Sequence, residues 1–266
     1  MSAIFQTILY QPIFNAFIAL YNLIPDVGIV ILIITVIIKL VLYPLTSSSI
    51  KSQKALTDLQ PKLEALKKKH AGDQQKVAAE TMKMYKENKV NPFGSCLPLL
   101  IQLPILISLY YVLRKVLTVD PSFDLLYTFV TQPESIKTLS LGFMELGKVA
   151  PVLALMAGGA QFWQARMMSR KKPPVVAGKG GKDEGMASMM NKQMLYFMPV
   201  LTVIIGFQLP GGLTLYWFLS TFLTALQQLV VFKRNAPKDA PANNKSTQGG
   251  SVSVGKEENV IEGKVE

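Results

Sequence analysis

One lysine within an apolar stretch is the side chain of this 266-residue sequence best placed to do chemistry. Lys39 lies three residues past the midpoint of residues 27–45, about 4.5 Å from the centre of that stretch at the rise of an α-helix. A lysine near the middle of a membrane span costs roughly 3 kcal/mol if it faces lipid, so it usually faces a bundle interior or a water-filled cavity. Its long side chain could instead reach the nearer end of the span. Lys39 is therefore either an anion-binding residue or a snorkelling one, and the residues alone leave both open.

Polar side chains in other apolar stretches could complete a hydrophilic groove around Lys39. Thr35 lies one helical turn before Lys39 and shares its face. Gln102, Gln161 and Gln164 lie in two further apolar stretches. Each of these side chains could equally make an ordinary interhelical hydrogen bond. Their joint presence with a lysine predicts a groove.

Several kinds of chemistry are excluded by residues that the apolar stretches lack. The stretch 27–45 and the four other apolar stretches contain no Asp or Glu, so the carboxylate relay of a proton pump is missing. His70 is the single histidine and Cys96 the single cysteine, which excludes an intramembrane Ser/His pair, a His-rich metal cluster and an intrachain disulfide. The sequence also lacks a phosphate-binding glycine motif. We therefore expect no catalytic residue, no metal, no cofactor and no enzymatic activity.

The elements that must position Lys39 are predicted to be membrane-spanning helices. Half of the residues are hydrophobic and 17% are charged, whereas soluble domains carry charge at about a quarter of positions. The charged residues gather in blocks and leave stretches long enough to cross about 30 Å of hydrocarbon. We predict an all-α polytopic membrane protein with five transmembrane helices, at residues 26–45, 93–114, 149–169, 191–209 and 210–232.

The distribution of basic residues predicts the orientation of these spans. Residues 46–92 carry ten lysines and residues 166–193 carry seven Lys or Arg, so both connections should be cytoplasmic, the second as a basic loop at 170–190. The external segment 115–148 carries three lysines against four acids. The N-terminus then lies outside and the C-terminus inside. The net charge of +11 fits orientation signals and anionic-lipid contacts, and we expect no nucleic-acid partner apart from a possible ribosome contact.

Residues 1–25 carry no charged side chain, so they lack the basic region of a signal peptide. Polar side chains fall on one helical face and apolar ones largely on another, which predicts an amphipathic helix in the external membrane interface. A sixth span is the alternative, and the charge count does not reject it. The polar residues are Gln11, Asn15 and Asn22, and the apolar ones are Phe14, Phe17, Leu20 and Ile24.

Residues 46–92 are predicted to form a basic helical hairpin. An apolar stripe with helical spacing occupies its first half, and Asp73 can cap a second helix. The hairpin is either a solvated connector or a docking device for a partner or for anionic lipid. The tail 233–266 has six basic and five acidic residues and a composition typical of disorder. The stripe is Leu56, Leu59, Leu63 and Leu66, and the second helix carries Val77, Met84 and Tyr85.

Three runs of sequence together resemble the YidC/Oxa family of membrane insertases. The resemblance covers about residues 20–232 and keeps the order of the runs, with the basic hairpin between the first two. The runs are Thr35-Val-Ile-Ile-Lys39 with Tyr43-Pro44-Leu45, Asn91-Pro-Phe-Gly-Ser-Cys-Leu-Pro-Leu-Leu-Ile-Gln-Leu-Pro104 with Tyr110-Tyr111, and Leu209-Pro-Gly-Gly-Leu-Thr-Leu-Tyr-Trp217 with Gln227-Gln228.

This resemblance implies an insertase and chaperone that works without ATP. Its hydrophilic groove would open to the cytoplasm and to lipid, receive nascent hydrophobic segments, and release them laterally into the bilayer. Lys39 matches the positive residue that attracts acidic N-terminal tails of substrates, although many relatives have arginine, whose planar fork a lysine lacks. Thr35, Gln164 and Trp217 match further groove positions.

The resemblance also implies a location and partners. The chain looks like the minimal bacterial core form, in the bacterial plasma (inner) membrane, working as a monomer. Nascent membrane proteins with acidic N-terminal tails are the expected substrates, and anionic lipids, the ribosome and the Sec translocon are candidate partners. Two rival functions stay open: a channel or small anion transporter that uses Lys39 as its binding site, and a structural scaffold for membrane complexes.

Overall fold

The computed structural model describes residues 3–70, 72–91, 94, 97–117, 123–168 and 193–234. Most of these residues are helical, which confirms the predicted all-α class; β1 (Leu139–Ser140) and β2 (Met144–Glu145) form one short antiparallel pair. The predicted loop 170–190 lies outside the described residues, as does the tail 233–266 beyond its first two residues. The helices are α1 (Ala3–Phe5), η1 (Gln6–Tyr10), α2 (Gln11–Leu23), α3 (Val27–Val41), α4 (Tyr43–Lys69), α5 (Gln74–Glu87), α6 (Leu97–Val116), α7 (Pro151–Met168), η3 (Gln193–Phe197), α9 (Met198–Gly206) and α10 (Gly211–Arg234).

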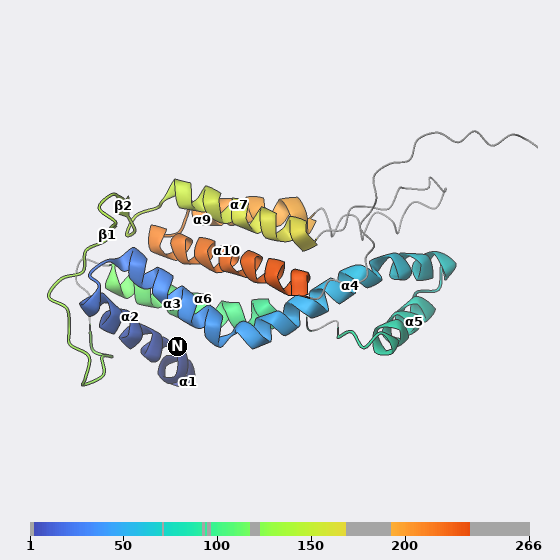
Figure 1. Ribbon diagram of the computed structural model, residues 1–266, viewed down its shortest axis with the longest axis horizontal. Helices are drawn as coiled ribbons and strands as arrows, with labels where there is room; N and C mark the ends of the chain where they lie inside the picture. The colour runs from blue at the N-terminus through green and yellow to red at the C-terminus, as the bar shows by residue number, and fades with distance from the viewer. Residues whose placement is uncertain are drawn as a thin grey trace, which may run out of the picture. The chain divides into compact units, whose positions relative to one another are not determined.

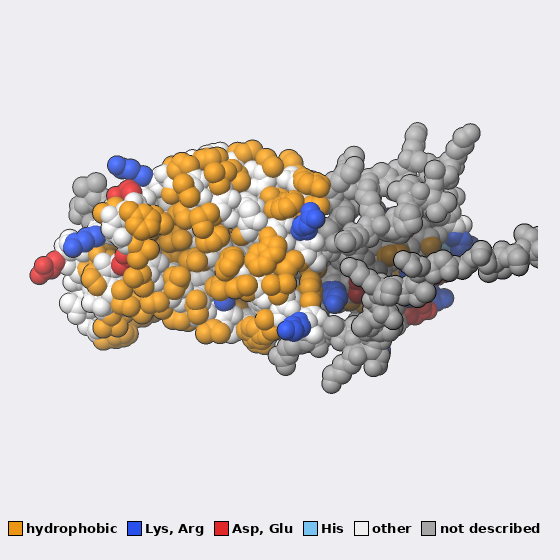
Figure 2. All heavy atoms as spheres, turned by 45° about the horizontal axis from the view of Figure 1, so that its top comes forward, with side chains coloured by type: hydrophobic (Ala, Val, Ile, Leu, Met, Phe, Trp, Pro, Cys, Tyr) orange, Lys and Arg blue, Asp and Glu red, His pale blue; other side chains and the backbone are white. Residues whose placement is uncertain are grey.

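Helix α10 lies in the middle of the helical bundle. Helices α7 and α9 pack side by side along one side of α10, and α3 and α6 lie on the other (Figure 1). We call the end where α3 and α10 begin the Asp26 end, and the end where α3 gives way to α4 the Lys39 end. Hydrophobic side chains cover most of the bundle face drawn in Figure 2, and most charged side chains visible there lie near the two ends, as expected for a surface that faces lipid.

Two of the described helices are long and apolar enough to cross a membrane, namely Ala3–Leu23 and Gly211–Lys233. Val27–Val41 and Tyr43–Lys67 give a third if the bent pair is one span, and Leu195–Gly206 is apolar but shorter. The five predicted spans therefore stay a prediction. The helix Ala3–Leu23 satisfies the length and composition required by the alternative of a further span.

The first predicted span, 26–45, is not one straight helix. Helix α3 ends at Val41, and α4 begins at Tyr43 after a bend of 69°. Pro44 supplies the reason, because proline has no backbone N–H to donate and is well tolerated only in the first turn of a helix. The bend places Lys39 in the last turn of α3, directly before a change of direction.

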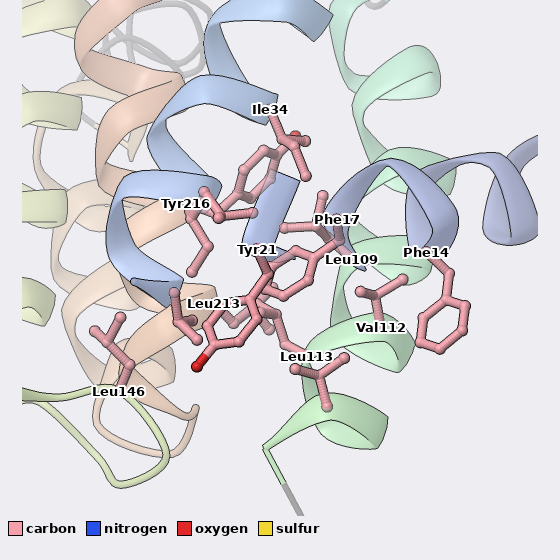
Figure 3. Close-up of a cluster of buried hydrophobic side chains, with 14 of the residues drawn as sticks. Phe14, Phe17, Tyr21, Ile34, Leu109, Val112, Leu113, Leu146, Leu213 and Tyr216 are labelled. Carbon is pink, nitrogen blue, oxygen red and sulfur yellow. The ribbon is translucent and has the colours of Figure 1, made fainter. Parts of the chain in front are cut away.

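The apolar face of α2 is buried within the protein. Phe14, Phe17 and Ile18 are fully buried, and Phe17 lies against Leu109 of α6 in the core drawn in Figure 3. The predicted interfacial helix was expected to place this face in the membrane. The protein core covers it because α2 packs against both α3 and α6.

The polar face of α2 binds the backbone of the segment that follows α6. Asn15 Nδ2 donates to the carbonyl oxygen of Leu125 at 2.9 Å, and Asn15 Oδ1 accepts from the N–H of Tyr127 at 2.6 Å. Asn22 Nδ2 donates to the carbonyl of Thr131 at 2.7 Å. These side chains therefore satisfy backbone groups of an irregular segment, which explains why this face of α2 is polar.

The same segment is also attached to the first residues of α3 and α10. Asp26 caps α3 by accepting from the N–H of Ile29, and its carboxylate also accepts from the Ser140 hydroxyl and from the N–H of Leu141. The backbone N–H groups of Gly211 and Gly212 donate to the carbonyls of Lys148 and Leu146. The segment thus connects α2, α3 and α10 at the Asp26 end.

The carboxylate of Asp26 should make stability depend on acidity. Burial alone would raise the pKa of Asp26, but the hydrogen bonds from Leu141, Ser140 and Ile29 outweigh it and hold that pKa below its usual value. A depressed pKa stabilises the fold above the unfolded pKa of about 4, and this stabilisation is lost as pH falls through the folded pKa. We expect Asp26→Asn to unfold at lower temperature than the wild type at pH 7, with a difference that shrinks below about pH 4 in detergent melting curves. A difference in melting temperature that stays the same between pH 7 and pH 3 would show that the charge of Asp26 does not stabilise the fold.

Helices α4 and α5 occupy the predicted hairpin region. Asp73 Oδ1 accepts from the N–H of Lys76 at 3.0 Å, which confirms the predicted cap of the second helix. Leu59 of the apolar stripe is buried, and α4 contacts α5. The basic hairpin as a docking device stays a prediction.

Candidate functional site

Lys39 points toward α10. Its side chain is half-buried, and its Nζ donates to the hydroxyl Oγ1 of Thr224 at 2.8 Å. The Thr224 hydroxyl in turn donates to the carbonyl of Ser220 on its own helix at 2.8 Å. The lysine therefore occupies a defined position between α3 and α10 and does not simply extend along the bundle surface.

A stripe of polar side chains runs along the face of α10 that includes Thr224. Its members are spaced at i, i+4, i+8 and i+11, which places them on one side of a helix. At one end Gln102 Nε2 of α6 donates to the Tyr216 hydroxyl at 2.7 Å. We call this set the α10 stripe; its members are Tyr216, Ser220, Thr224 and Gln227.

Gln227 holds the bend between α3 and α4. Its Nε2 donates to the carbonyl of Tyr43 at 3.1 Å and to the hydroxyls of Thr46 and Ser47 at 2.8 and 2.9 Å. Tyr43 opens α4 two residues after α3 ends, so one amide of α10 binds the first turn of α4 directly after the break. The amide links the bend to the helix that contacts Lys39.

Thr35 does not extend a polar surface beside Lys39 as expected. It is buried, with 1% of its surface exposed, and its hydroxyl donates to the carbonyl of Ile31 at 2.6 Å. This is the usual way a buried threonine satisfies its hydroxyl within a helix. Thr35 therefore lies one turn from Lys39, and within the described residues no hydrogen bond joins the two side chains.

The three predicted glutamines lie in different surroundings. Gln102 joins α6 to the α10 stripe, whereas Gln161 Oε1 accepts from the Thr202 hydroxyl at 2.7 Å and joins α7 to α9. Gln164 and Trp217 are both half-buried, on α7 and α10. Within the described residues no hydrogen bond links Gln161 or Gln164 to Lys39. Among these three glutamines, the hydrogen bonds of the described residues connect Gln102 alone to α10, the helix that contacts Lys39.

Sequence reasoning missed Thr224 as the partner of Lys39, and Ser220 and Gln227 as members of the same polar face of α10. The signal that could have found them is the regular recurrence of polar residues in an otherwise apolar helix, beginning at Tyr216. That pattern identifies a polar face of α10. It does not predict that α3 packs against this face.

The electrostatic character of the site follows from what its helices lack. Helices α3, α6, α7, α9 and α10 contain no Asp or Glu, so none of them offers Lys39 a carboxylate partner. Thr224 supplies a neutral oxygen in its place. An amine held this way can attract an anionic group of a ligand. In the described part of the chain, no three His, Cys, Asp or Glu side chains are arranged to hold a metal ion.

Comparison with known proteins links this arrangement to a family. Residues 19–239 match the model of the 60Kd inner membrane protein family. A protein of Fusobacterium nucleatum named membrane protein insertase YidC is 37% identical over 210 residues, which cover 79% of this chain and 87% of that protein. The protein of the same name from Tolumonas auensis is 33% identical over 88% of this chain, and there the match spans 38% of the relative's length. The membrane protein insertase YidC 1 of Listeria monocytogenes is 33% identical over 80% of this chain and 67% of its own length.

Proposed function

The chain belongs to the 60Kd inner membrane protein family of YidC/Oxa insertases, and from this premise we propose that it inserts other membrane proteins into the bilayer through a groove at Lys39. It is a multi-pass protein of the inner membrane and not an enzyme. The observation that carries the proposal is the ammonium of Lys39, held by Thr224 between two apolar helices that lack acidic residues.

In the proposed mechanism, a nascent segment with an acidic N-terminal tail approaches from the Lys39 end. Moving a charged tail into a low-dielectric region is costly, and a fixed positive charge offsets part of that cost. The hydrophobic part of the segment then partitions laterally into lipid, so no ATP is needed.

The proposed topology has five spans, with the N-terminus outside and the C-terminus in the cytoplasm. Helix Ala3–Leu23 is proposed to lie at the external interface, bound through its polar face to the segment after α6; a sixth span is the alternative. The α4–α5 hairpin then lies in the cytoplasm, where its lysines can meet anionic lipid. The ribosome and the Sec translocon are proposed partners, and the working unit is proposed to be a monomer.

A reconstituted insertion assay tests the proposal. The purified full chain is placed in liposomes, and a single-span substrate with an acidic N-terminal tail is synthesised in their presence without ATP-dependent factors other than those of translation. We expect protease-protected substrate in these vesicles and little in empty liposomes. Protection equal to that of empty liposomes, together with anion flux through the protein, would reject the insertase and support the channel alternative.

Thr224 should act as a positioning residue for Lys39. Thr224→Val keeps the branched shape but removes the oxygen that accepts from Nζ. Because an intramolecular hydrogen bond contributes about 0.5–1.5 kcal/mol net, we expect insertion of the acidic-tailed substrate to fall roughly twofold to tenfold. Thr224→Ser should retain activity, and a substrate with a neutral tail should be little affected. An equal loss for both substrates would indicate that Thr224 only supports the fold.

A further inference from the structure

The turn between β1 and β2 presents large apolar side chains outward. The two strands pair Leu139 with Glu145 and Ser140 with Met144, and three residues connect them. Of these, Leu141 is 60% exposed and Phe143 is 73% exposed. Exposed aromatic and aliphatic groups gathered in one turn are uncommon on a surface that faces water, and they often mark an interaction site.

The backbone of this turn is unusual for the residues it contains. Leu141 has φ +51° and Gly142 has φ +79°. Glycine adopts such angles freely, but a leucine in the left-handed region is strained. The N–H of Leu141 donates to Asp26 Oδ2 at 2.7 Å, which helps to hold it there. A strained residue that also exposes an apolar side chain suggests that the exposure serves a function.

The turn lies at the level where two helices begin. Ser140 packs so closely on the first turn of α3 that a Cβ on Gly28 would collide with its hydroxyl oxygen. The segment directly after the strands accepts hydrogen bonds from Gly211 and Gly212 at the start of α10. Because α10 is long and apolar enough to cross a membrane, its first residues mark the membrane boundary at the Asp26 end.

The apolar surface continues from the turn into α7. Figure 1 shows β1 and β2 beside the start of α7. Val149, just before this helix, and Val152 and Leu155 within it are all exposed. On a membrane protein this exposed helix surface faces lipid, so the turn extends a lipid-facing surface up to its boundary. Lys148 directly precedes Val149, and its side chain is exposed, so its ammonium can reach lipid phosphates.

We propose that the turn Leu141–Phe143 inserts its apolar side chains into the bilayer leaflet at the Asp26 end, at the boundary between headgroups and acyl chains. Aromatic and apolar groups bind favourably at this depth. The contact anchors the segment that joins α2, α3 and α10 to the membrane itself. The inference requires only a membrane location and does not depend on the Lys39 groove; in the proposed topology the leaflet is the outer one.

Site-directed spin labelling of the full chain tests this contact. Cys96→Ser removes the single cysteine, and Phe143→Cys, Val152→Cys and Glu134→Cys then each provide one labelling site. Val152 is the lipid-facing control, and Glu134 is an exposed acidic control from the same segment as the turn. Each labelled protein is reconstituted in phosphatidylcholine and phosphatidylglycerol vesicles. Power saturation then compares access to oxygen, which enters lipid, with access to a nickel chelate, which stays in water.

We expect the label at position 143 to follow the label at position 152, with high access to oxygen and several-fold lower access to the chelate than at position 134. Access to the chelate equal to that at position 134 would overturn the proposal, because the turn would then lie in water. Exclusion of both reagents would also overturn it and point to a contact with a second copy of the chain. Leu141→Cys repeats the measurement at the other side of the turn.

Discussion

Replacing Lys39 with glutamate should reduce insertion of an acidic-tailed substrate by about tenfold or more, whereas Lys39→Arg should retain most of it. A tenfold change corresponds to about 1.4 kcal/mol, and two unit charges 4 Å apart interact by about 4 kcal/mol at an effective dielectric constant of 20. Reversing the sign at Lys39 converts this attraction into repulsion. Protease protection of the substrate in proteoliposomes measures the effect.

Two controls separate the local charge from the net charge of the protein. Lys137→Glu makes the same charge reversal at an exposed residue of the segment after α6. It should leave insertion unchanged. Lys39→Ala should lie between the arginine and glutamate variants, and the loss should grow with the number of acidic residues in the substrate tail. Equal insertion by all Lys39 variants would mean that this lysine only snorkels.

Gly158→Val is expected to destabilise the bundle where α7 packs on α9. A Cβ at Gly158 would collide with the Val203 side chain and lie 3.1 Å from the carbonyl oxygen of Pro199, so α7 and α9 can approach this closely only without a side chain there. Overpacking a tight contact typically costs about 1–3 kcal/mol, and the backbone of α9 leaves little room to relax. Thermal unfolding of the purified protein in detergent should show the loss as a lower melting temperature.

Gly159 provides a matched control in the same helix. A Cβ at Gly159 meets no atom within 4 Å. Gly159→Ala should therefore be neutral or slightly stabilising, because alanine favours a helix over glycine by up to about 1 kcal/mol. If Gly158→Val melts at the same temperature as Gly159→Ala, the close approach of α7 and α9 is not important for stability.

Hydropathy and proline carry most of the information in the sequence about where helices begin and end. Helices α7 and α10 begin and end within two residues of the predicted spans. The break at Leu42 was missed because residues 40–45 on both sides of it carry no charged side chain, and hydropathy does not register a change of direction. Pro44 was visible in the sequence, but a proline can open a helix as readily as end one.

The surroundings of the site were harder to predict than the residue at its centre. Lys39 was identifiable because a charge stands out in an apolar stretch. Its partner Thr224 is 185 positions away along the chain, and only the packing of α3 on α10 brings the two together. Thr35 shares a helical face with Lys39, yet its hydroxyl is used by its own helix.

The N-terminal helix shows the same limit. The sequence indicated a polar face and an apolar face, but it did not indicate which parts of the protein cover each face. Asn15 binds the backbone of Leu125 and Tyr127, a partner segment without regular structure and therefore without a periodic signal. Amphipathicity indicates that a helix has two environments; it does not say whether the polar one is water or protein.

Photocrosslinking of a trapped substrate tests the central claim most directly. A photoreactive benzoylphenylalanine replaces Trp217, which lies seven residues before Thr224 on the same side of α10, or Leu155, which is exposed on α7. A ribosome-bound single-span substrate with an acidic tail is then presented to each variant in proteoliposomes. We predict crosslinks from position 217 that weaken when Lys39 is also replaced by glutamate, and few from position 155. Crosslinks from position 155 but not from position 217 would contradict the account, because the substrate would then enter the bilayer without passing the Lys39 site.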